Sequence, residues 1–321
     1  MKIYPVILFA YNRPEHTRLV LEALKKNQLA GQTELFVFID GPRATATASQ
    51  KKDIDEVLKV VESEQWCKNV VIRAHQQNIG CRNSIIQGIT TVLSQHEAAI
   101  ILEDDIVTSP HFLNFMNKCL NFYRDYPAVF SISGLNLEHN KIQIPDDYKY
   151  DVYVSLRQFN SGWATWSDRW NKINWNKDTL KEFLTNPVLC DAYSRGGDDL
   201  IPMLYDEIEG RSDAWDVQFT FNQFKHHGVS IIPIHSYVDN IGGDGTGTHH
   251  TNAGEFLRFN IEKAIPEPRL LDILYEDKRL INAFYNAYSR VKRPLWKKII
   301  NRISRIITGS NVFIIKKKIY H

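Results

Sequence analysis

Residues 98–107 read AAIILEDDIV, an apolar run that passes directly into three acidic side chains. A short, near-continuous apolar run is typical of a parallel strand that is covered on both faces of a sheet. The chain has four more runs of this kind, at 3–10, 34–40, 69–74 and 128–133. Helical patterns separate them, at 14–27, 49–64, 81–94 and 110–126. This alternation predicts an α/β fold with a doubly wound, mainly parallel sheet and flanking helices.

Pairs of polar or turn residues lie at or just past the ends of four predicted strands. They are Asn12 with Arg13, Asp40 with Gly41, Arg82 with Asn83, and Asp104 with Asp105. Each pair by itself is equally consistent with an ordinary surface turn, because turns favour such residues. Ligands of doubly wound sheets bind beyond the carboxyl ends of the strands, where the four pairs would meet. Together they predict a ligand site at that edge of the sheet.

The acidic triplet Glu103, Asp104 and Asp105 predicts a metal site. Adjacent carboxylates repel one another, and packing beside a buried strand increases the cost of that repulsion. Mg²⁺ and Mn²⁺ relieve it, because they take carboxylate, water and phosphate oxygens as ligands. A solvated acidic turn, or a charge pair near the helix that Pro110 introduces, explains the same residues without a metal.

The wider segment AAIILEDDIVTSPHFLNFMNKCL resembles the Glu-Asp-Asp segment of the N-acetylglucosaminyltransferase I family and its bacterial relatives. Four other segments are similar to the same family and to family 2-like sugar transferases: PVILFAYNRPEHTRLVLEAL, FIDGPR, QNIGCRNSIIQGI and AWDVQFTFN. The ordered similarity covers about residues 3–250. It implies a GT-A fold and a nucleotide-sugar donor, for which a UDP-sugar is the best expectation.

The resemblance also implies roles for the residues at the strand ends. Arg13 corresponds to an arginine that faces the donor phosphates, Asp40 lies near the base or ribose, and Asp104 lies nearer the ribose. Asp105 corresponds to the direct ligand of Mn²⁺ or Mg²⁺. The expected donor-binding residues are Asn12, Arg13, Asp40, Arg82, Glu103 and Asp104.

Asp216 is the candidate catalytic base. An inverting transfer needs a group that takes the proton of the acceptor hydroxyl, and a cation that stabilises the departing diphosphate. The family's tryptophan-aspartate motif has two adjacent acids, but Val217 stands where the second would be. Asp213 therefore stays open as the alternative base. Helix N-capping explains either aspartate without catalysis.

A glycine-rich loop at 241–250 follows a predicted strand at 229–235. Glycine allows close approach of the backbone to a ligand, which suits a lid over a diphosphate. His249 is the expected second metal ligand or a phosphate donor. A surface loop with incidental histidines is the alternative, and the loop is not a Walker motif because no Gly-Lys-Ser/Thr follows it.

Four of the seven tryptophans lie between 161 and 175. Their ring faces can stack on sugars, so Gly162, Trp163 and the later Trp215 are assigned to the acceptor or sugar pocket. Trp163, Trp166 and Trp170 also have the spacing of a core-facing helical stripe. We expect two of these three in the core and one in the pocket.

The last 32 residues differ from the rest of the chain in their charge. Residues 290–321 hold ten Lys or Arg and no Asp or Glu, which leaves 29 basic against 37 acidic residues elsewhere. An acidic body argues against nucleic-acid binding. In 295–307 the apolar and basic residues fall on opposite helical faces, which predicts binding to an anionic membrane surface. A helix packed on its own domain is the alternative.

The predicted organisation is a catalytic domain at 1–260, with a donor half to about 135 and an acceptor half after it. A helical extension at 261–289 and the basic amphipathic tail at 290–321 follow. The four cysteines show no disulfide or zinc spacing, and the apolar run at 3–11 is too short to span a bilayer. These features favour a cytoplasmic protein, peripheral on the inner face of the membrane.

Together the patterns predict a metal-dependent, inverting glycosyltransferase of surface glycan assembly, with a glycan or lipid-linked acceptor. Two alternatives are a sugar-nucleotide nucleotidyltransferase and a non-catalytic, membrane-associated glycan-binding protein. The first usually has a glycine-rich, arginine-bearing loop after its first strand, which AYNRPEHT is not. Metal-dependent nucleotide binding would argue against the second.

Overall fold

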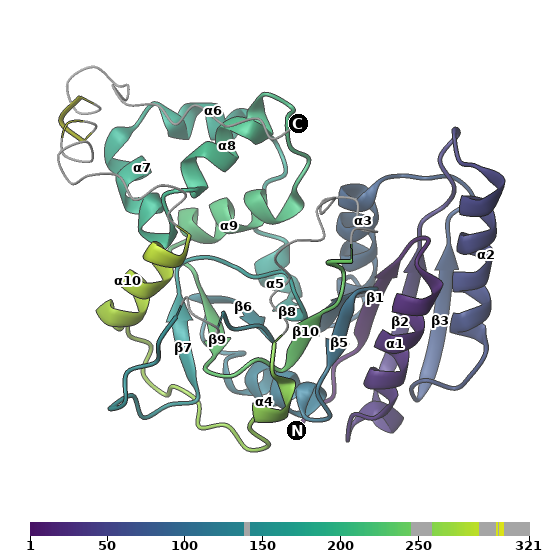
Figure 1. The fold of residues 1–321 in the computed structure, drawn as a ribbon. Coiled ribbons are helices and arrows are strands. Elements are labelled where there is room, and N and C mark those ends of the chain that lie inside the picture. Colours follow the sequence, from purple (N-terminus) through teal and green to yellow (C-terminus); the bar gives the residue numbers. More distant parts are fainter. Residues whose placement is uncertain (138–141, 245–258, 289–299, 301, 305–321) are drawn as a thin grey trace.

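A computed structural model describes residues 1–137, 142–244, 259–288, 300 and 302–304 (Figure 1). Within them, eight strands form one sheet in the order β3-β2-β1-β4-β8-β6-β9-β7. The strands β7 and β8 run opposite to the other six. The predicted fold class is confirmed, because the molecule has a large, mainly parallel central sheet with flanking helices.

The first half of the sheet follows the predicted alternation. Its strands are β1 (Val6–Ala10), β2 (Glu34–Ile39), β3 (Asn69–Ala74) and β4 (Ala98–Glu103). The pairs β3–β2, β2–β1 and β1–β4 are all parallel. Residues of β1 and β4 are buried on both faces, as their continuous apolar runs require, whereas β3 is an exposed edge strand.

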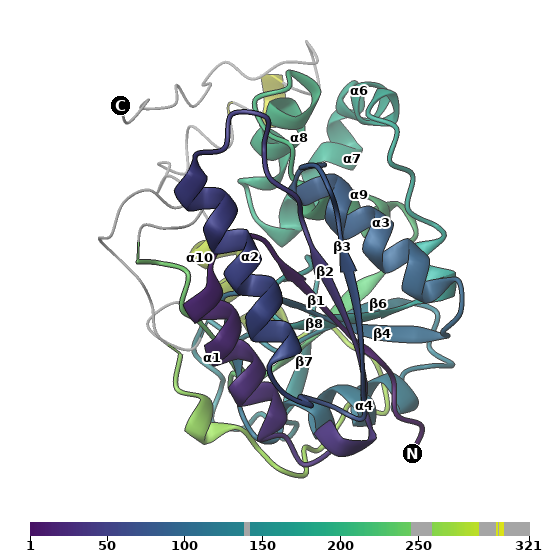
Figure 2. The same ribbon diagram turned by 90° about the vertical axis from the view of Figure 1, so that its right-hand side faces the viewer.

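Helices cover both faces of these strands. On one side lie α1 (Pro14–Lys25) and α2 (Ala48–Glu62), and on the other lies α3 (Cys81–Leu93), as Figure 2 shows. Val20, Leu21 and Leu24 of α1 belong to the apolar cluster on the first face. Ile85 and Ile89 of α3 belong to the cluster on the second face. Pro14 begins α1 as predicted.

The second half of the sheet contains a strand that the sequence patterns missed. Trp163–Trp166 forms β8, which is antiparallel to both β4 and β6 (Val129–Ser133). The helical stripe proposed for this segment is therefore wrong. Trp163 and Trp166 are three positions apart on a strand, so they face opposite sides and join different apolar clusters. Farther out lie β9 (Val229–Pro233) and the edge strand β7 (Val152–Ser155).

A helical layer lies beyond the second half of the sheet (Figure 1). It contains α5 (Ser167–Trp170), α6 (Asp178–Leu184), α7 (Pro187–Tyr193), the 3-10 turn η2 (Ser194–Gly196), α8 (Leu200–Ile208) and α9 (Trp215–Lys225). The region from Asp178 to Tyr193 forms two helices rather than one. Asn186 caps α7 by accepting from the N–H groups of Val188 and Leu189, and Pro187 starts the new helix.

A small antiparallel sheet lies beyond the acidic triplet. It pairs β5 (Ile106–Thr108) with β10 (Val238–Asn240). The helix α4 (Phe112–Phe122) follows β5 and starts two residues after Pro110, so this proline lies before the helix rather than in its first turn. Asn240, the last residue of β10, pairs with Ile106, which directly follows the acidic triplet. The glycine-rich loop therefore begins beside the triplet, because Ile241 directly follows β10.

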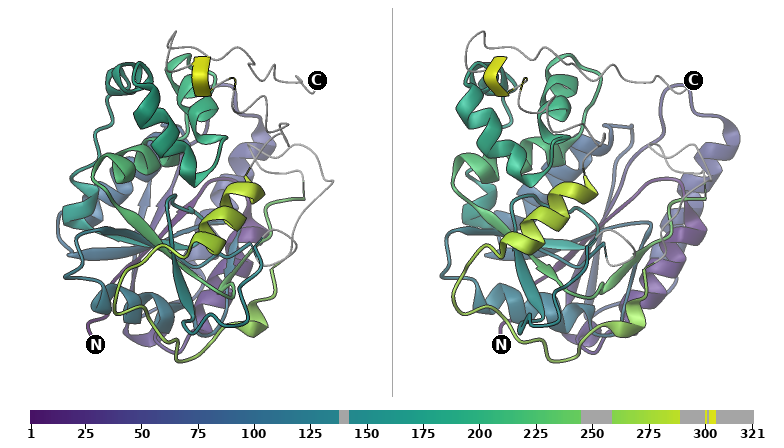
Figure 3. Two further views of the ribbon diagram at one scale, coloured as in Figure 1. Left: turned by 90° about the vertical axis from the view of Figure 1, so that its left-hand side faces the viewer. Right: turned by 60° about the vertical axis from the view of Figure 1, so that its left-hand side comes forward.

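The segment 259–288 packs on the main body. It contains η3 (Ile261–Lys263) and α10 (Lys278–Ala287), with irregular backbone between them. Figure 3 shows α10 in front of the second half of the sheet. Leu271, Leu280 and Phe284 are buried in the same apolar cluster as β7 and α4. A further 3-10 turn, η1 (Ala30–Gln32), precedes β2.

The basic tail falls almost entirely outside the described residues. Residues 300 and 302–304 are helical, and Arg302 lies 3.8 Å from Asp191. Among the residues that the structure describes, no helix has the length and apolar character needed to cross a membrane. All four cysteines lie in the described part, and no disulfide joins them there.

Candidate functional site

The loops that follow β1 and β4 place Arg13 against the acidic triplet. Its guanidinium donates to Asp104 Oδ1, and its Nη2 lies 3.1 Å from Asp105 Oδ2. The backbone N–H of Tyr11 donates to Asp104 Oδ2 over 3.4 Å. These contacts form because β1 and β4 are parallel neighbours, so their carboxyl ends lie side by side. Asn12 is half-buried next to Arg13.

Negative charge accumulates at this point of the sheet. Burial raises the pKa of Glu103, and the carboxylates of Asp105, Asp104 and Asp216 raise it further. Burial also raises the pKa of Asp104, although the adjacent Arg13 acts in the opposite direction. Burial lowers the pKa of Arg13, but the two carboxylates outweigh that effect and its pKa is raised. One guanidinium therefore only partly offsets the acidic triplet.

Arg13 also has hydrogen-bonding capacity that the described residues do not use. Its Nη1 is buried and has no hydrogen-bond partner among them. A buried N–H without a partner is costly, so this N–H is a candidate donor to a ligand. A phosphate oxygen is a suitable acceptor for it.

The start of the glycine-rich loop contacts the acidic triplet. The N–H of Ile241 donates to the backbone oxygen of Asp105 over 2.9 Å. A Cβ added to Gly242 would overlap the Asp105 carboxylate, so only glycine allows this approach. Asp244 lies 3.2 Å from His16 Nε2 of α1. His249 and the rest of the loop lie outside the described residues, so its predicted role in metal binding stays a prediction.

The residues around Asp105 fit a hard divalent cation that takes most of its ligands from a bound substrate and from water. The Asp105 side chain is 18% exposed, against 6% for Asp104, so it is the more accessible carboxylate. Mg²⁺ is usually bound by one or two carboxylates together with phosphate and water oxygens. Within the described ranges, no three His, Cys, Asp or Glu side chains form an all-protein metal site. The mutual repulsion of the buried carboxyl groups of the triplet supplies the reason for a cation.

The Asp40 carboxylate is hydrogen-bonded to the loop that precedes α3. Its carboxylate accepts from the N–H groups of Gly41, Ile79 and Gly80 and from the side chain of Asn78, over 2.8–3.1 Å. These four hydrogen bonds match the acceptor capacity of a carboxylate. They fix the segment that leads into α3. A direct contact of Asp40 with the donor stays a prediction, whereas its support of this loop is observed.

Arg82 lies inside α3 rather than in a loop after β3, and it reaches the helical layer. Its Nη1 lies 3.2 Å from Glu207 Oε1 of α8, and its Nη2 donates to Gln218 of α9. Its Nε lies 3.5 Å from Asp213. The observed role of Arg82 is therefore to join the two halves of the molecule. Its contact with the donor stays a prediction.

Asp216 and Asp213 differ sharply in their environments. Asp216 lies in the first turn of α9, where burial raises its pKa and the charge of Arg157 partly opposes this. Asp213 is exposed, with 72% of its side chain accessible, and lies near Arg82 and Lys177. Ala214 is the N-cap of α9, so the capping role considered for both aspartates is wrong. A buried carboxylate with a raised pKa has the character of a general base.

The three residues assigned to the sugar pocket are packed inside the protein. Trp163 is fully buried, and its ring stacks on Trp215 with centroids 5.1 Å apart. Gly162 has φ of +59°, accepts a hydrogen bond from the N–H of Gly134, and leaves no room for a side chain beside Val238. Trp166 and Trp170 are also buried. The core role of these residues is observed, and a pocket role stays a prediction.

A buried polar cluster beside α9 escaped the sequence patterns. Arg157 Nη1 donates to both carboxylate oxygens of Asp199 over 2.9 and 3.1 Å, and its guanidinium lies 3.8 Å from the ring centroid of Tyr288. Gln158 and Tyr193 are also buried here. The signal in the sequence was weak, because single polar residues in 156–200 match no motif.

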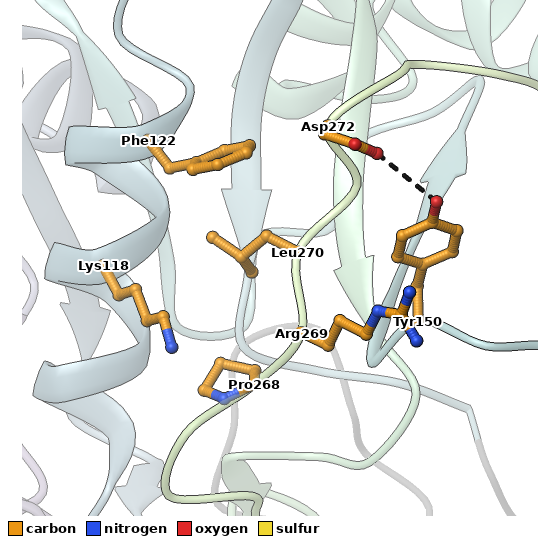
Figure 4. Close-up of a pocket in the computed structure, with 7 residues that line it drawn as sticks. All are labelled: Lys118, Phe122, Tyr150, Pro268, Arg269, Leu270 and Asp272. Carbon is orange, nitrogen blue, oxygen red and sulfur yellow. Dashed lines mark hydrogen bonds between the residues drawn. The ribbon is translucent and has the colours of Figure 1, made fainter.

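A separate hollow lies between α4 and the segment 268–272 (Figure 4). Its cavity volume of about 240 Å³ is below the range of roughly 300–1,000 Å³ that is usual for ligand pockets. Asn121, in the same turns of α4 as Lys118 and Phe122 of this hollow, hydrogen-bonds to Lys2. The hollow therefore lies toward the amino end of β1, away from Asp105.

A scan against protein-family models finds no match to the chain, and a search of curated proteins finds none either. Solved structures that match include S. aureus TarS residues 1–349, at 14% identity over 74% of this chain and 60% of that chain, with a TM-score of 0.45. Mouse xyloside xylosyltransferase 1 matches at 12% identity over 70% and 81%, with a TM-score of 0.35. A UDP-glucose pyrophosphorylase complexed with UDP-glucose matches at 11% identity over 72% and 90%, with a TM-score of 0.36.

The chain therefore spans less than two thirds of the TarS fragment that it matches. These similarities concern the fold. The functional proposal below rests on the chemistry of the site.

Proposed function

We propose that the protein is a glycosyltransferase that moves a sugar from a nucleotide-sugar donor to an acceptor hydroxyl with inversion. One observation carries the proposal. The acidic triplet lies at the carboxyl end of β4, and Arg13 from the end of β1 contacts two of its carboxylates while keeping a buried N–H without a partner among the described residues. This combination suits a diphosphate and its cation.

The residues of this site have distinct roles in the proposed reaction. Arg13 binds and orients the donor diphosphate, and Asp105 holds a Mn²⁺ or Mg²⁺ ion, together with His249. The bound cation stabilises negative charge on the leaving diphosphate. Asp216 takes the proton of the acceptor hydroxyl as that oxygen bonds to the anomeric carbon, and the bond from that carbon to the diphosphate oxygen breaks.

The donor is proposed to be a UDP-sugar carrying a hexosyl or N-acetylhexosaminyl group. The acceptor is proposed to be a glycan or a lipid-linked glycan in surface glycan assembly, which the basic tail at 290–321 would bring close at the inner face of the membrane. Ten positive charges without an acidic residue support this location, because anionic lipids attract such segments.

The test is donor hydrolysis across UDP-, GDP- and dTDP-sugars, with Mn²⁺, with Mg²⁺ and with a chelator. We expect release of the nucleoside diphosphate from one donor class, and loss of that release with the chelator. Formation of a nucleotide-sugar and pyrophosphate from a nucleoside triphosphate and a sugar 1-phosphate would instead identify a nucleotidyltransferase. Glycan binding without turnover of any donor would identify a binding protein.

A further inference from the structure

The segment that follows β7 carries two polar side chains into the interior. Arg157 and Gln158 are only 7% and 5% exposed. Asp199 fixes the Arg157 guanidinium from one side, and the ring of Tyr288 lies 3.8 Å from it. The turn that brings Asp199 into place requires Gly197, whose φ is +141° and where a Cβ would overlap Asp199. The local backbone is therefore built around this ion pair.

Several buried polar atoms of this cluster have no hydrogen-bond partner among the described residues. The Nε of Arg157, both amide atoms of Gln158 and the hydroxyl of Tyr193 are buried without a hydrogen-bond partner among the described residues. Leaving such a group unsatisfied costs about 1–3 kcal/mol, and native proteins contain few of them. Four such atoms in neighbouring side chains indicate a ligand that bonds to them.

The cluster lies beside the proposed base. Tyr193 of α7 packs in one apolar cluster with Val217, the residue that follows Asp216. Burial raises the pKa of Tyr193 and Tyr288, and the carboxylates of Asp199 and Asp216 raise it further. Arg157 in turn opposes the rise in the pKa of Asp216. These influences decay with distance, so the groups lie near the start of α9, where Tyr193 shares an apolar cluster with Val217.

The charge of the cluster limits what it can bind. The positive charge of Arg157 is compensated by Asp199, and Asp216 adds a negative charge nearby. A phosphate or carboxylate would therefore meet no net positive charge. An N–H, an amide and a phenol hydroxyl instead offer donors and acceptors of the kind that pair with sugar hydroxyls.

We propose that Arg157, Gln158 and Tyr193 form a subsite that hydrogen-bonds an uncharged sugar residue of the acceptor beside Asp216. This inference rests on the proposed transferase function. It adds that the acceptor sugar is neutral and that these three side chains determine its binding.

Tyr193→Phe gives the sharpest test, because it removes only the hydroxyl. Transfer is measured in the full-length protein with p-nitrophenyl glycosides of neutral hexoses and of glucuronic acid as acceptors. We expect neutral glycosides to be used in preference to the acidic one. In the variant, the KM for the neutral glycoside should rise about tenfold, the loss of one hydrogen bond. Donor hydrolysis should stay unchanged, and the melting temperature should not fall, because the Tyr193 hydroxyl has no hydrogen bond to lose among the described residues.

Tyr237→Phe is the matched control. The Tyr237 hydroxyl donates to the backbone oxygen of Ile265 over 2.7 Å, so its removal should lower the melting temperature and leave the KM for the acceptor unchanged. The inference is overturned if Tyr193→Phe behaves like this control, since its hydroxyl would then have a partner within the protein. It is also overturned if no neutral glycoside is used. Absence of donor hydrolysis in the wild type would contradict the transferase function itself.

Discussion

The Nη2 atom of Arg13 lies 3.1 Å from the Oδ2 atom of Asp105. The two residues are 92 positions apart in the chain and come from the loops after two parallel neighbours in the sheet. The guanidinium supplies one positive charge to a group of three carboxyl groups, and the proposed cation would relieve the repulsion that remains among them.

Asp105→Asn should keep the fold and lose metal-dependent nucleotide binding. Asparagine has a similar shape but no charge to offer a hard cation. We expect the Mn²⁺-dependent affinity for UDP, measured by calorimetry, to fall at least about tenfold, the scale seen when groups that support a metal are removed. Asp178→Asn, at an exposed position paired with Lys181, is the control and should bind UDP normally. An unchanged affinity of Asp105→Asn would show that another residue holds the metal.

Asp216→Asn should lower turnover by about 100-fold or more, which is the scale of general-base catalysis, without weakening donor binding. Asp213→Asn should change turnover little, because its exposed carboxylate lacks the environment that raises a pKa. The opposite result, a normal Asp216→Asn and an inactive Asp213→Asn, would transfer the role of base to Asp213.

Asp216→Asn should also be more stable than the wild type at neutral pH. The pKa of Asp216 is raised above its ordinary value of 3.8, so this carboxyl favours folding only while it is protonated. That contribution is complete below pH 3.8 and is lost as the pH rises through the pKa of the folded protein. The difference in melting temperature between variant and wild type should therefore shrink as the pH falls toward 3.8. A difference that does not vary with pH would rule out this electrostatic origin.

Asp40→Ala should destabilise the protein by about 3 kcal/mol, because it leaves buried N–H groups of the loop before α3 without an acceptor. Chemical denaturation measures this. Asp55→Ala, at an exposed position of α2, should change the free energy of unfolding by less than about 0.5 kcal/mol. If Asp40→Ala kept full stability but lost donor affinity, its carboxylate would act on the ligand and not on the loop.

Removal of 290–321 should abolish binding to anionic vesicles and preserve transfer to a soluble acceptor. Each basic residue near such a surface contributes about 1 kcal/mol, and salt weakens the attraction. Co-sedimentation with vesicles at low and high salt measures the binding, and a thermal melt of the truncated protein accompanies it. A lower melting temperature with aggregation would support the alternative, in which the tail packs on its own domain.

The sequence by itself determined the first half of the molecule closely. The strands β1 to β4 and the helices between them follow from apolar periodicity and from Pro14, because these signals act over a few neighbouring residues. The strand ends also predicted that Arg13 and the acidic triplet would meet, since parallel strands align their carboxyl ends. Residues 128–133 and 229–235 were predicted as strands for the same reason.

Only the tertiary structure decided how the second half is arranged and what several polar residues do. Trp163–Trp166 is a strand because it fills the place between β4 and β6, and its tryptophan spacing alone suggested a helix. Asp40 and Arg82 are engaged by partners up to 136 positions away, and Arg157 meets Asp199 through a turn that Gly197 allows. Such contacts join distant parts of the chain, so no local pattern carries them. Burial then determines which carboxylate has the properties of a base.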